Sequence, residues 1–299
     1  MSKEFSKDVY LLPGWGTDCR TFFRLDLPGV TLHEMNYIEA GKDDTMADYA
    51  KRLIDHYQFK PNSFIIGCSF GGMVGTEIAK QVPVDKLVLI SSAKTRSELP
   101  SRITRWSGFP IERLPTAGLI RWWVAHHSTI VKKMDERFQR QFKEMVLEND
   151  DAFLRKSVHF MVNWQNDVEP SNVLHIHGDR DIVIPIDNIG ECETIRRGDH
   201  LMLVNRSEEI SALVEKFFNE EPLPTYSKSQ LALHNGSEKE VIWVAYQGLI
   251  YDVSESRLWR DGKHYEHWAG QDLTEELDND APHTKEVFAK FKVIGKLKG

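Results

Sequence analysis

The segment Gly67-Cys68-Ser69-Phe70-Gly71 has the residue types and spacing of an activated serine. An apolar run precedes it from Ser63 to Ile66, and residues 70–81 have the apolar spacing of a helix. A serine at a sharp strand-to-helix turn needs glycine neighbours, because its own backbone is strained and the chain crosses close by. Its hydroxyl then points outward at a helix N-terminus, which favours a developing negative charge. We therefore expect a nucleophilic serine, and a helix-capping serine in a glycine-rich turn is the simpler alternative.

Two later strand-like runs are followed by residues that would activate this serine. The run 173–176 leads to Asp179 and Asp181, and the run 192–195 leads to His200. A serine hydroxyl is a poor nucleophile until a histidine accepts its proton and a carboxylate orients that histidine. The chain order is therefore serine, aspartate, histidine. Taken singly, each aspartate is a plausible turn residue and the histidine a plausible loop residue, but together they predict a catalytic trio.

The elements that would position these residues alternate between strands and helices. This alternation predicts an α/β fold with a doubly wound, mostly parallel sheet. From about residue 94 to 166 no strand is evident, and this helical stretch predicts a cap over the serine. Its large aromatic residues form the cap's own core in the simpler interpretation, or line an apolar acyl pocket. The expected strands are 9–12, 30–35, 63–66, 86–91, 173–176 and 192–195, the expected helices 45–57, 70–81 and 206–218, and the cap aromatics Trp106, Trp122, Trp123, Phe138, Phe142, Phe153, Phe160 and Trp164.

Two other features, a turn after the first strand and a cysteine after the third, bear on the chemistry. The turn Pro13-Gly14-Trp15-Gly16 follows the first strand, at the sheet edge where ligands bind in α/β folds. A loop here is the expected source of a second hydrogen-bond donor to an oxyanion. Cys68 precedes the serine, and we interpret it as a small buried residue rather than as the nucleophile.

Residues 1 to 218 resemble the α/β-hydrolase family, in the style of small esterases such as the pimeloyl-carrier methyl-esterase. The resemblance rests on Pro13 to Gly16, Gly67 to Gly72, His177-Gly178-Asp179-Arg180-Asp181 with Pro185, and Gly198-Asp199-His200. It implies that Ser69 is the nucleophile, His200 the base and Asp181, rather than Asp179, the acid. It also implies that the backbone N–H groups of Trp15 and Phe70 form the oxyanion hole.

The sequence departs from this family at two positions. Pro13 stands where a histidine usually precedes the oxyanion loop, which changes the support of the loop more than its donors. Asp199 precedes the histidine where relatives often have glycine, and it is a rival hydrogen-bond partner for His200.

A second domain follows a proline-rich linker, residues 219–224. We expect a short helix at 227–233, a hairpin of strands 241–246 and 249–253, and a final helix at 285–292. Residues 225–299 resemble the cytochrome b5-like haem/steroid-binding family, on Ala245 to Ser254, Ala269 to Thr274 and His283-Thr284. In haem-binding members two histidines hold the iron, and the resemblance implies His283 as one of them. The His-Pro-Gly-Gly segment of the other ligand is missing, so His264 or His267 would replace it. Alternatively, the module binds another ligand or only packs.

Composition excludes several classes of function. The chain has 299 residues, 28% of them charged, and a net charge of −7, which argues against general nucleic-acid binding. No apolar run is long enough to span a membrane. Three scattered cysteines, Cys19, Cys68 and Cys192, suit a reducing cytoplasm.

The sequence thus predicts a serine carboxylesterase or thioesterase that acts on a small molecule through an acyl-enzyme. The hydrolase would need no cofactor, whereas the C-terminal domain is a candidate for haem. The alternative is a non-catalytic or weakly catalytic hydrolase scaffold that binds or senses a haem- or steroid-type ligand. Protein partners and the identity of the substrate are not specified by the sequence.

Overall fold

The computed structural model of the protein describes residues 7–109, 118, 135–221, 223–237, 241–279 and 285–298. The chain divides into two compact units, Met1–Asn219 and Glu220–Gly299. No helix in the described ranges is both long enough and apolar enough to cross a membrane.

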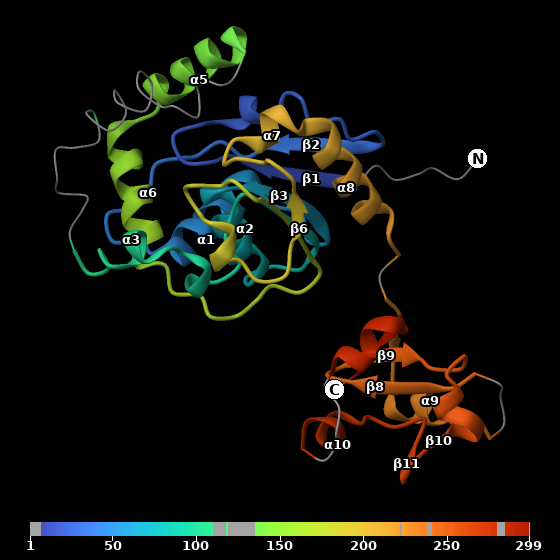
Figure 1. The fold of residues 1–299 in the computed structure, drawn as a ribbon. Coiled ribbons are helices and arrows are strands. Elements are labelled where there is room, and N and C mark those ends of the chain that lie inside the picture. Colours follow the sequence, from blue (N-terminus) through green and yellow to red (C-terminus); the bar gives the residue numbers. More distant parts are fainter. Residues whose placement is uncertain are drawn as a thin grey trace. The chain divides into compact units, whose positions relative to one another are not determined.

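A six-stranded, wholly parallel sheet forms the centre of the N-terminal unit (Figure 1). The strands are β1 (Lys7–Leu12), β2 (Val30–Glu34), β3 (Ser63–Cys68), β4 (Val84–Ile90), β5 (Val173–Gly178) and β6 (Glu193–Ile195). Their order across the sheet is β2-β1-β3-β4-β5-β6. The order reverses next to β3, and ligands in such sheets bind at the carboxyl ends of the strands.

Helices cover both faces of this sheet, so the predicted doubly wound α/β fold is confirmed. Tyr10 and Leu12 of β1 pack with α1 (Met46–Tyr57) and α2 (Phe70–Ala79) on one face. Val9 and Leu11 pack on the other face with α8 (Ser207–Asn219) and the short α7 (Met202–Asn205). Successive side chains of a strand point to opposite faces, which is why the central strands are apolar throughout.

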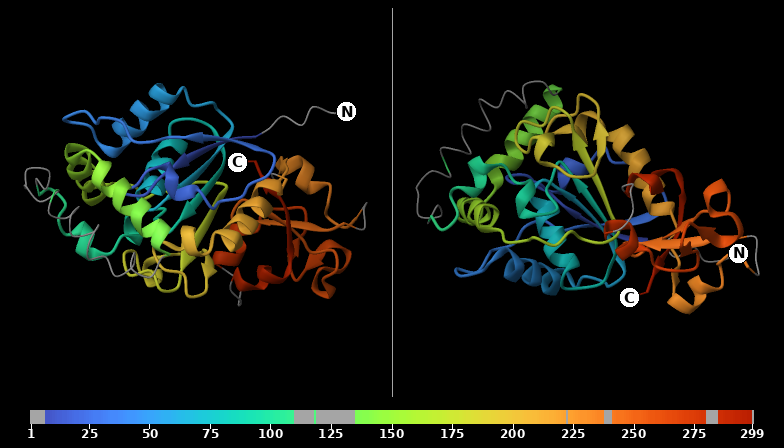
Figure 2. Two further views of the ribbon diagram at one scale, coloured as in Figure 1. Left: turned by 90° about the horizontal axis from the view of Figure 1, so that it is seen from above. Right: turned by 60° about the horizontal axis from the view of Figure 1, so that its bottom comes forward.

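The chain between β4 and β5 supplies a helical cap. Its described helices are α3 (Ser101–Thr104), α5 (Glu136–Glu148) and α6 (Asp151–Asn163). In both views of Figure 2 the green segment with α5 and α6 lies to one side of the blue and teal strands. Asp135 and Asp150 accept hydrogen bonds from the backbone N–H groups of Phe138 and Phe153 and so cap the two longer helices.

Most of the cap aromatics that are described belong to cores, as the simpler interpretation expected. Phe138 and Phe142 pack with Met145 and Val146 of the same helix. Phe153, Phe160 and Trp164 join the core of α1 and α2, whereas Trp106 is exposed. Trp122 and Trp123 lie outside the described residues.

The C-terminal unit is a small α+β domain with a four-stranded sheet in the order β7-β12-β9-β8. Strands β8 and β9 form the predicted hairpin across Gln247-Gly248. A second, two-stranded ribbon pairs β10 with β11. The elements are β7 (Thr225–Tyr226), α9 (Lys228–Ala232), β8 (Trp243–Tyr246), β9 (Leu249–Asp252), β10 (Lys263–His264), β11 (His267–Trp268), α10 (Thr274–Asn279) and β12 (Lys292–Leu297).

The final helix predicted over residues 285–292 is present in part, as a helix of another type. The structure has a 3₁₀ helix at Lys285–Lys290 and then β12, which no sequence pattern indicated. Strand β12 lies between β7 and β9, parallel to the first and antiparallel to the second. These pairings satisfy the backbone groups of β12 on both sides, and partners of this kind leave no local pattern in the sequence.

Candidate active site

Ser69 lies at the sharp turn between β3 and α2, in a conformation that side chains rarely adopt. Its φ is 51° and its ψ is −118°. A Cβ on Gly71 would lie 2.1 Å from the carbonyl oxygen of Leu12, and a Cβ on Gly67 would lie 2.5 Å from the Cα of Gly72. The glycines of this segment therefore allow the backbone contacts that hold the serine in its strained turn.

Ser69, His200 and Asp181 form a continuous hydrogen-bonded chain. The Nε2 atom of His200 lies 3.0 Å from Ser69 Oγ, and its Nδ1 atom lies 2.7 Å from Asp181 Oδ2. In the tautomer that suits both contacts, Nδ1–H donates to the carboxylate and Nε2 accepts from the serine hydroxyl. The structure thus brings together the three residues that the sequence singled out.

The Asp181 carboxylate is buried and firmly held. Its Oδ1 accepts from the backbone N–H groups of Val183 (2.8 Å) and Ile184 (2.9 Å). Burial by itself raises the pKa of Asp181, but the hydrogen bond and charge of His200 and the Ile184 N–H outweigh it, so the pKa lies below its ordinary value. The carboxylate is therefore ionised at neutral pH and is suited to stabilise an imidazolium.

The two rival aspartates do not contact His200. Asp199 Oδ1 accepts from the backbone N–H of Leu201 (3.0 Å) and so supports the turn after β6. Asp179 is exposed, and both ring nitrogens of His200 have other partners, Asp181 and Ser69. Of Asp179, Asp181 and Asp199, only Asp181 is hydrogen-bonded to the imidazole of His200.

Two buried histidines on β5 belong to the surroundings of the site and were not predicted. His177 Nε2 donates to the carbonyl oxygen of Ile184 (2.8 Å) and lies 3.4 Å from Asp181 Oδ2. His175 Nε2 donates to the carbonyl of Ser92 (3.1 Å). Burial lowers the pKa of both, that of His175 to about 3, so both are neutral. The sequence carried one sign of them: His175 and His177 flank Ile176 in an otherwise apolar strand, where histidines are unusual.

The predicted oxyanion residues lie against the serine. The loop Pro13–Gly16 is packed on the serine turn, because a Cβ on Gly14 would lie 3.6 Å from Ser69 Cβ. Phe70 is the first residue of α2, so its backbone N–H is one of those that a helix leaves without an intrahelical acceptor. Within the described ranges, neither the Phe70 nor the Trp15 backbone N–H has a recorded acceptor.

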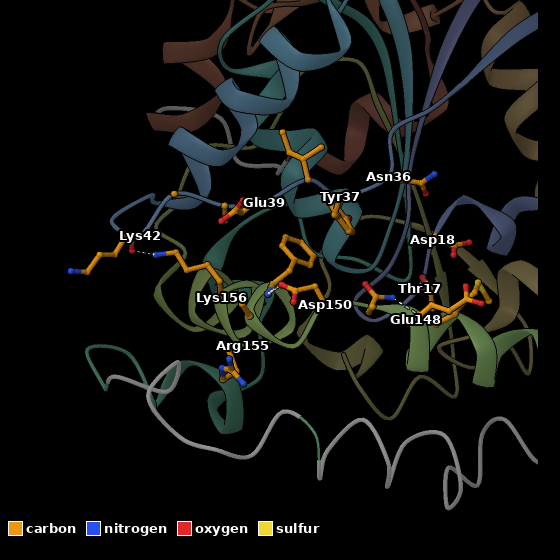
Figure 3. Close-up of a pocket in the computed structure, with 17 residues that line it drawn as sticks. Thr17, Asp18, Asn36, Tyr37, Glu39, Lys42, Glu148, Asp150, Arg155 and Lys156 are labelled. Atoms are coloured by element: carbon orange, nitrogen blue, oxygen red, sulfur yellow. Dashed lines mark hydrogen bonds between the residues drawn. The ribbon is translucent and has the colours of Figure 1, made fainter.

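A cavity of about 830 Å³ lies between the loop 36–42 and the cap helices α5 and α6, and its lining residues are drawn in Figure 3. Tyr37 and Phe153 lie on its wall, and Lys156 reaches across to donate to the carbonyl of Lys42 (2.8 Å). Ser69 and His200 are not among the described residues that line it. The cavity comes near the oxyanion loop at Thr17 and Tyr37, which donate hydrogen bonds to the carbonyls of Gly14 and Pro13. Its wall combines charged side chains with apolar ones such as Ile38 and Phe153, so it is not the purely apolar acyl pocket considered from the sequence.

Cys68 is buried beside the serine, as expected, and burial raises the pKa of its thiol to about 12. A thiol with so high a pKa is a poor nucleophile at neutral pH. The structure therefore agrees with the interpretation of Cys68 as a small packing residue.

In the C-terminal unit, His264 and His267 face each other across the β10–β11 ribbon. Side chains of directly paired residues lie on the same face of a ribbon. The His264 ring packs 5.1 Å from that of Trp259, and its Nδ1 donates to the carbonyl of Leu258 (3.1 Å). The third candidate, His283, lies outside the described residues. Among the described residues no cluster of three or more metal-ligating side chains occurs.

A sequence model described as the Alpha/beta hydrolase family matches residues 7–213, about two thirds of the chain. The chain belongs to the α/β-hydrolase family. A second model, described as Cytochrome b5-like Heme/Steroid binding domain, matches residues 227–298. No curated protein sequence matches the chain significantly.

Solved structures with similar folds fall into the same two groups. An esterase from Thermogutta terrifontis is 15% identical at a TM-score of 0.56, covering 71% of this chain and 89% of that one. A hydrolase from Pseudomonas aeruginosa is 16% identical at a TM-score of 0.54, covering 72% and 91%. At such low sequence identities, these proteins are similar to the α/β-hydrolase unit in fold alone. A Hadesarchaea cytochrome b5 domain protein is 47% identical at a TM-score of 0.24, covering 25% of this chain and 97% of that one.

Proposed function

We propose that this α/β hydrolase is a serine carboxylesterase or thioesterase that acts through an acyl-enzyme on Ser69. The proposal rests on one observation, the hydrogen-bonded chain from Ser69 Oγ through His200 to the buried Asp181 carboxylate. We assign residues 1–218 to the hydrolase domain with its cap at about 94–166, residues 219–224 to the linker, and residues 225–299 to the second domain.

The acylation step uses each member of the chain once. As Ser69 Oγ attacks the carbonyl carbon of the ester or thioester, its proton passes to His200 Nε2. Asp181 stabilises the imidazolium through the Nδ1–H hydrogen bond. When the tetrahedral intermediate collapses, Nε2 returns the proton to the departing alkoxide or thiolate, leaving the acyl group on Ser69.

Deacylation repeats the same chemistry with water. His200 Nε2 removes a proton from the attacking water, the carboxylic acid departs, and Ser69 Oγ recovers its proton. In both steps negative charge develops on the substrate's carbonyl oxygen, and the backbone N–H groups of Phe70 and Trp15 are proposed to donate to it. A positioned base contributes about 10²–10⁴-fold and one oxyanion donor about 10²–10³-fold.

Labelling with a fluorophosphonate, followed by intact mass, tests this proposal. The expected result is one adduct on wild type, none on Ser69→Ala, and much slower labelling of His200→Ala. Ser101→Ala is the matched control, because Ser101 is an exposed serine at the start of the short α3 and should label like wild type.

Failure of a folded wild type to form an adduct would contradict the hydrolase proposal. The non-catalytic scaffold would then be the better account of the first domain. If wild type forms the adduct, its rates of hydrolysis on a panel of esters and thioesters would identify the acyl group that it prefers.

We further propose that the C-terminal domain binds haem through His264 and His283. In support, the Nδ1 hydrogen bond of His264 to the Leu258 carbonyl is a contact that commonly orients a metal-binding imidazole. His267 lies on the same face of the ribbon, so His264 and His267 together cannot approach iron from opposite sides. Bound haem would supply a one-electron redox centre.

Absorbance after addition of haem tests the assignment. We expect an intense band near the blue edge of the visible spectrum that is lost in His264→Ala and His283→Ala. It should persist in His267→Ala and in His234→Ala, whose histidine stacks on Trp243 at a ring distance of 3.5 Å. A wild type that stays colourless would remove haem from the account.

We place the protein in a reducing compartment, the cytoplasm. Supporting this, the three cysteines are free thiols and two of them are buried.

A further inference from the structure

The oxyanion loop is held by three side-chain hydrogen bonds, one local and two to distant parts of the domain. Thr17 Oγ1 donates to the carbonyl of Gly14 (3.0 Å), which closes the loop on itself. The Tyr37 hydroxyl donates to the carbonyl of Pro13 (2.5 Å). The Trp15 indole N–H donates to the carbonyl of Leu154 (3.2 Å).

The Tyr37 contact supplies the support at Pro13, where the family usually has a histidine. Burial raises the pKa of the Tyr37 phenol well above its ordinary value, so the hydroxyl keeps its proton and donates. The ring packs at centroid distances of 5.2 Å from Phe70 and 4.9 Å from Phe153. Tyr37 therefore joins the loop to both the serine helix and the cap.

The Trp15 contact reaches the cap directly. Leu154 lies in the first turn of α6, next to the Phe153 that stacks on Tyr37. Gly16 also faces the cap, because a Cβ there would lie 3.9 Å from side-chain atoms of Leu154 and Val146. Leu154 thus contacts the loop that carries the Trp15 backbone N–H directly, and its neighbour Phe153 contacts that loop's support, Tyr37.

We propose that Trp15 is a positioning residue, whose indole ties the oxyanion donor on its own backbone to cap helix α6. A displacement of α6 would move the indole and, through a loop pinned at Pro13 and Gly14, reorient the N–H. The cavity of Figure 3 is lined by the same turn of α6 and by Tyr37 and Thr17, so a ligand that fills it touches this linkage. Cap position would then affect kcat more than KM, because the donor acts on the transition state.

This inference rests on the proposed hydrolase function and is tested with Trp15→Phe in the full chain. The substitution removes the indole N–H and keeps an aromatic ring. Trp164→Phe is the matched control: its indole donates to Glu77 Oε1 (2.8 Å) on α2 and so also joins the cap segment to the sheet domain, but this hydrogen bond does not involve the oxyanion loop. Tyr37→Phe, which deletes one oxygen and keeps the stacked ring, is a second variant at the opposite anchor.

We expect Trp15→Phe to lower kcat about 10- to 100-fold with KM changed less than about twofold. A misplaced oxyanion donor loses much of its stabilisation of the transition state. Trp164→Phe should stay within about twofold of wild type. Amide hydrogen exchange at residues 14–17 should be faster in Trp15→Phe than in Trp164→Phe, and Tyr37→Phe should lower kcat in the same direction.

Equal kcat in the two tryptophan variants, or equal exchange in the loop, would overturn the inference while leaving the hydrolase proposal intact. A wild type without fluorophosphonate reactivity would instead overturn the hydrolase proposal, and the catalytic role of the tether with it.

Discussion

The strain at Ser69 can be measured by comparing two inactive variants. The φ of 51° and ψ of −118° lie in a region that favours glycine. Ser69→Ala and Ser69→Gly both remove the hydroxyl and its 3.0 Å hydrogen bond with His200. They differ only in the Cβ atom, so the difference in their free energies of unfolding reports the strain that a side chain creates at this turn.

The expected difference follows from two opposing effects. Holding an L-residue at positive φ costs about 1–2 kcal/mol. Glycine loses more backbone entropy on folding, which costs about 0.5–1 kcal/mol. Ser69→Gly should therefore be more stable than Ser69→Ala by about 1 kcal/mol, or about 2–4 °C in the melting temperature of a domain of this size.

Thermal unfolding of the hydrolase domain within the full chain, with urea unfolding as a second method, would measure this difference. Ala79→Gly is the control, because Ala79 ends α2 in ordinary helical geometry, where glycine should destabilise by about 0.5–1 kcal/mol. If Ser69→Gly proved less stable than Ser69→Ala by as much as Ala79→Gly is less stable than wild type, the turn would store no strain and our account of the glycine-rich segment would be wrong.

Three further predictions concern the surroundings of the serine. Burial lowers the pKa of His175 to about 3, below its unfolded value near 6.5, so the folded state loses stability as the pH falls from about 6.5 to 3. In His175→Phe the free energy of unfolding should therefore vary less over that pH range, by a few kcal/mol, as measured by urea unfolding at several pH values. Gly71→Ala should abolish activity and destabilise the fold by several kcal/mol, because its Cβ would lie 2.1 Å from the Leu12 carbonyl oxygen. Gly190→Ala is the control and should melt like wild type, since the nearest atoms to its Cβ would lie at 3.5 Å. Similar melting temperatures of the two variants would refute the steric argument. Asp181→Asn should slow fluorophosphonate labelling by about 10²–10⁴-fold without loss of fold, and an unchanged rate would remove the carboxylate from the proposed mechanism.

Local sequence determined the serine turn and the change of fold at the linker. Gly67, Gly71 and Gly72 mark the turn because each meets backbone or a neighbouring side chain where a Cβ would be. The strand before it and the helix after it follow from apolar spacing over a few residues, which is a property of the chain itself. The order of the serine, aspartate and histidine is likewise visible in the sequence, and so is the hairpin around Gln247-Gly248.

Only the tertiary structure decided which distant groups meet. Ser69 and His200 are 131 residues apart, and the choice of Asp181 over Asp199 depends on the turn after β6, in which Asp199 bonds to Leu201 instead. The support of the oxyanion loop by Tyr37 also has no local signal, because its partner is a carbonyl 24 residues away.

The same reason explains why strand β12 was not predicted. Residues 292–297 form a strand because two neighbouring strands offer backbone partners on both sides, and a short segment's own preference cannot reveal them. Local spacing thus fixed the chemistry available to this protein, whereas contacts between distant segments fixed which residues are close enough to use it.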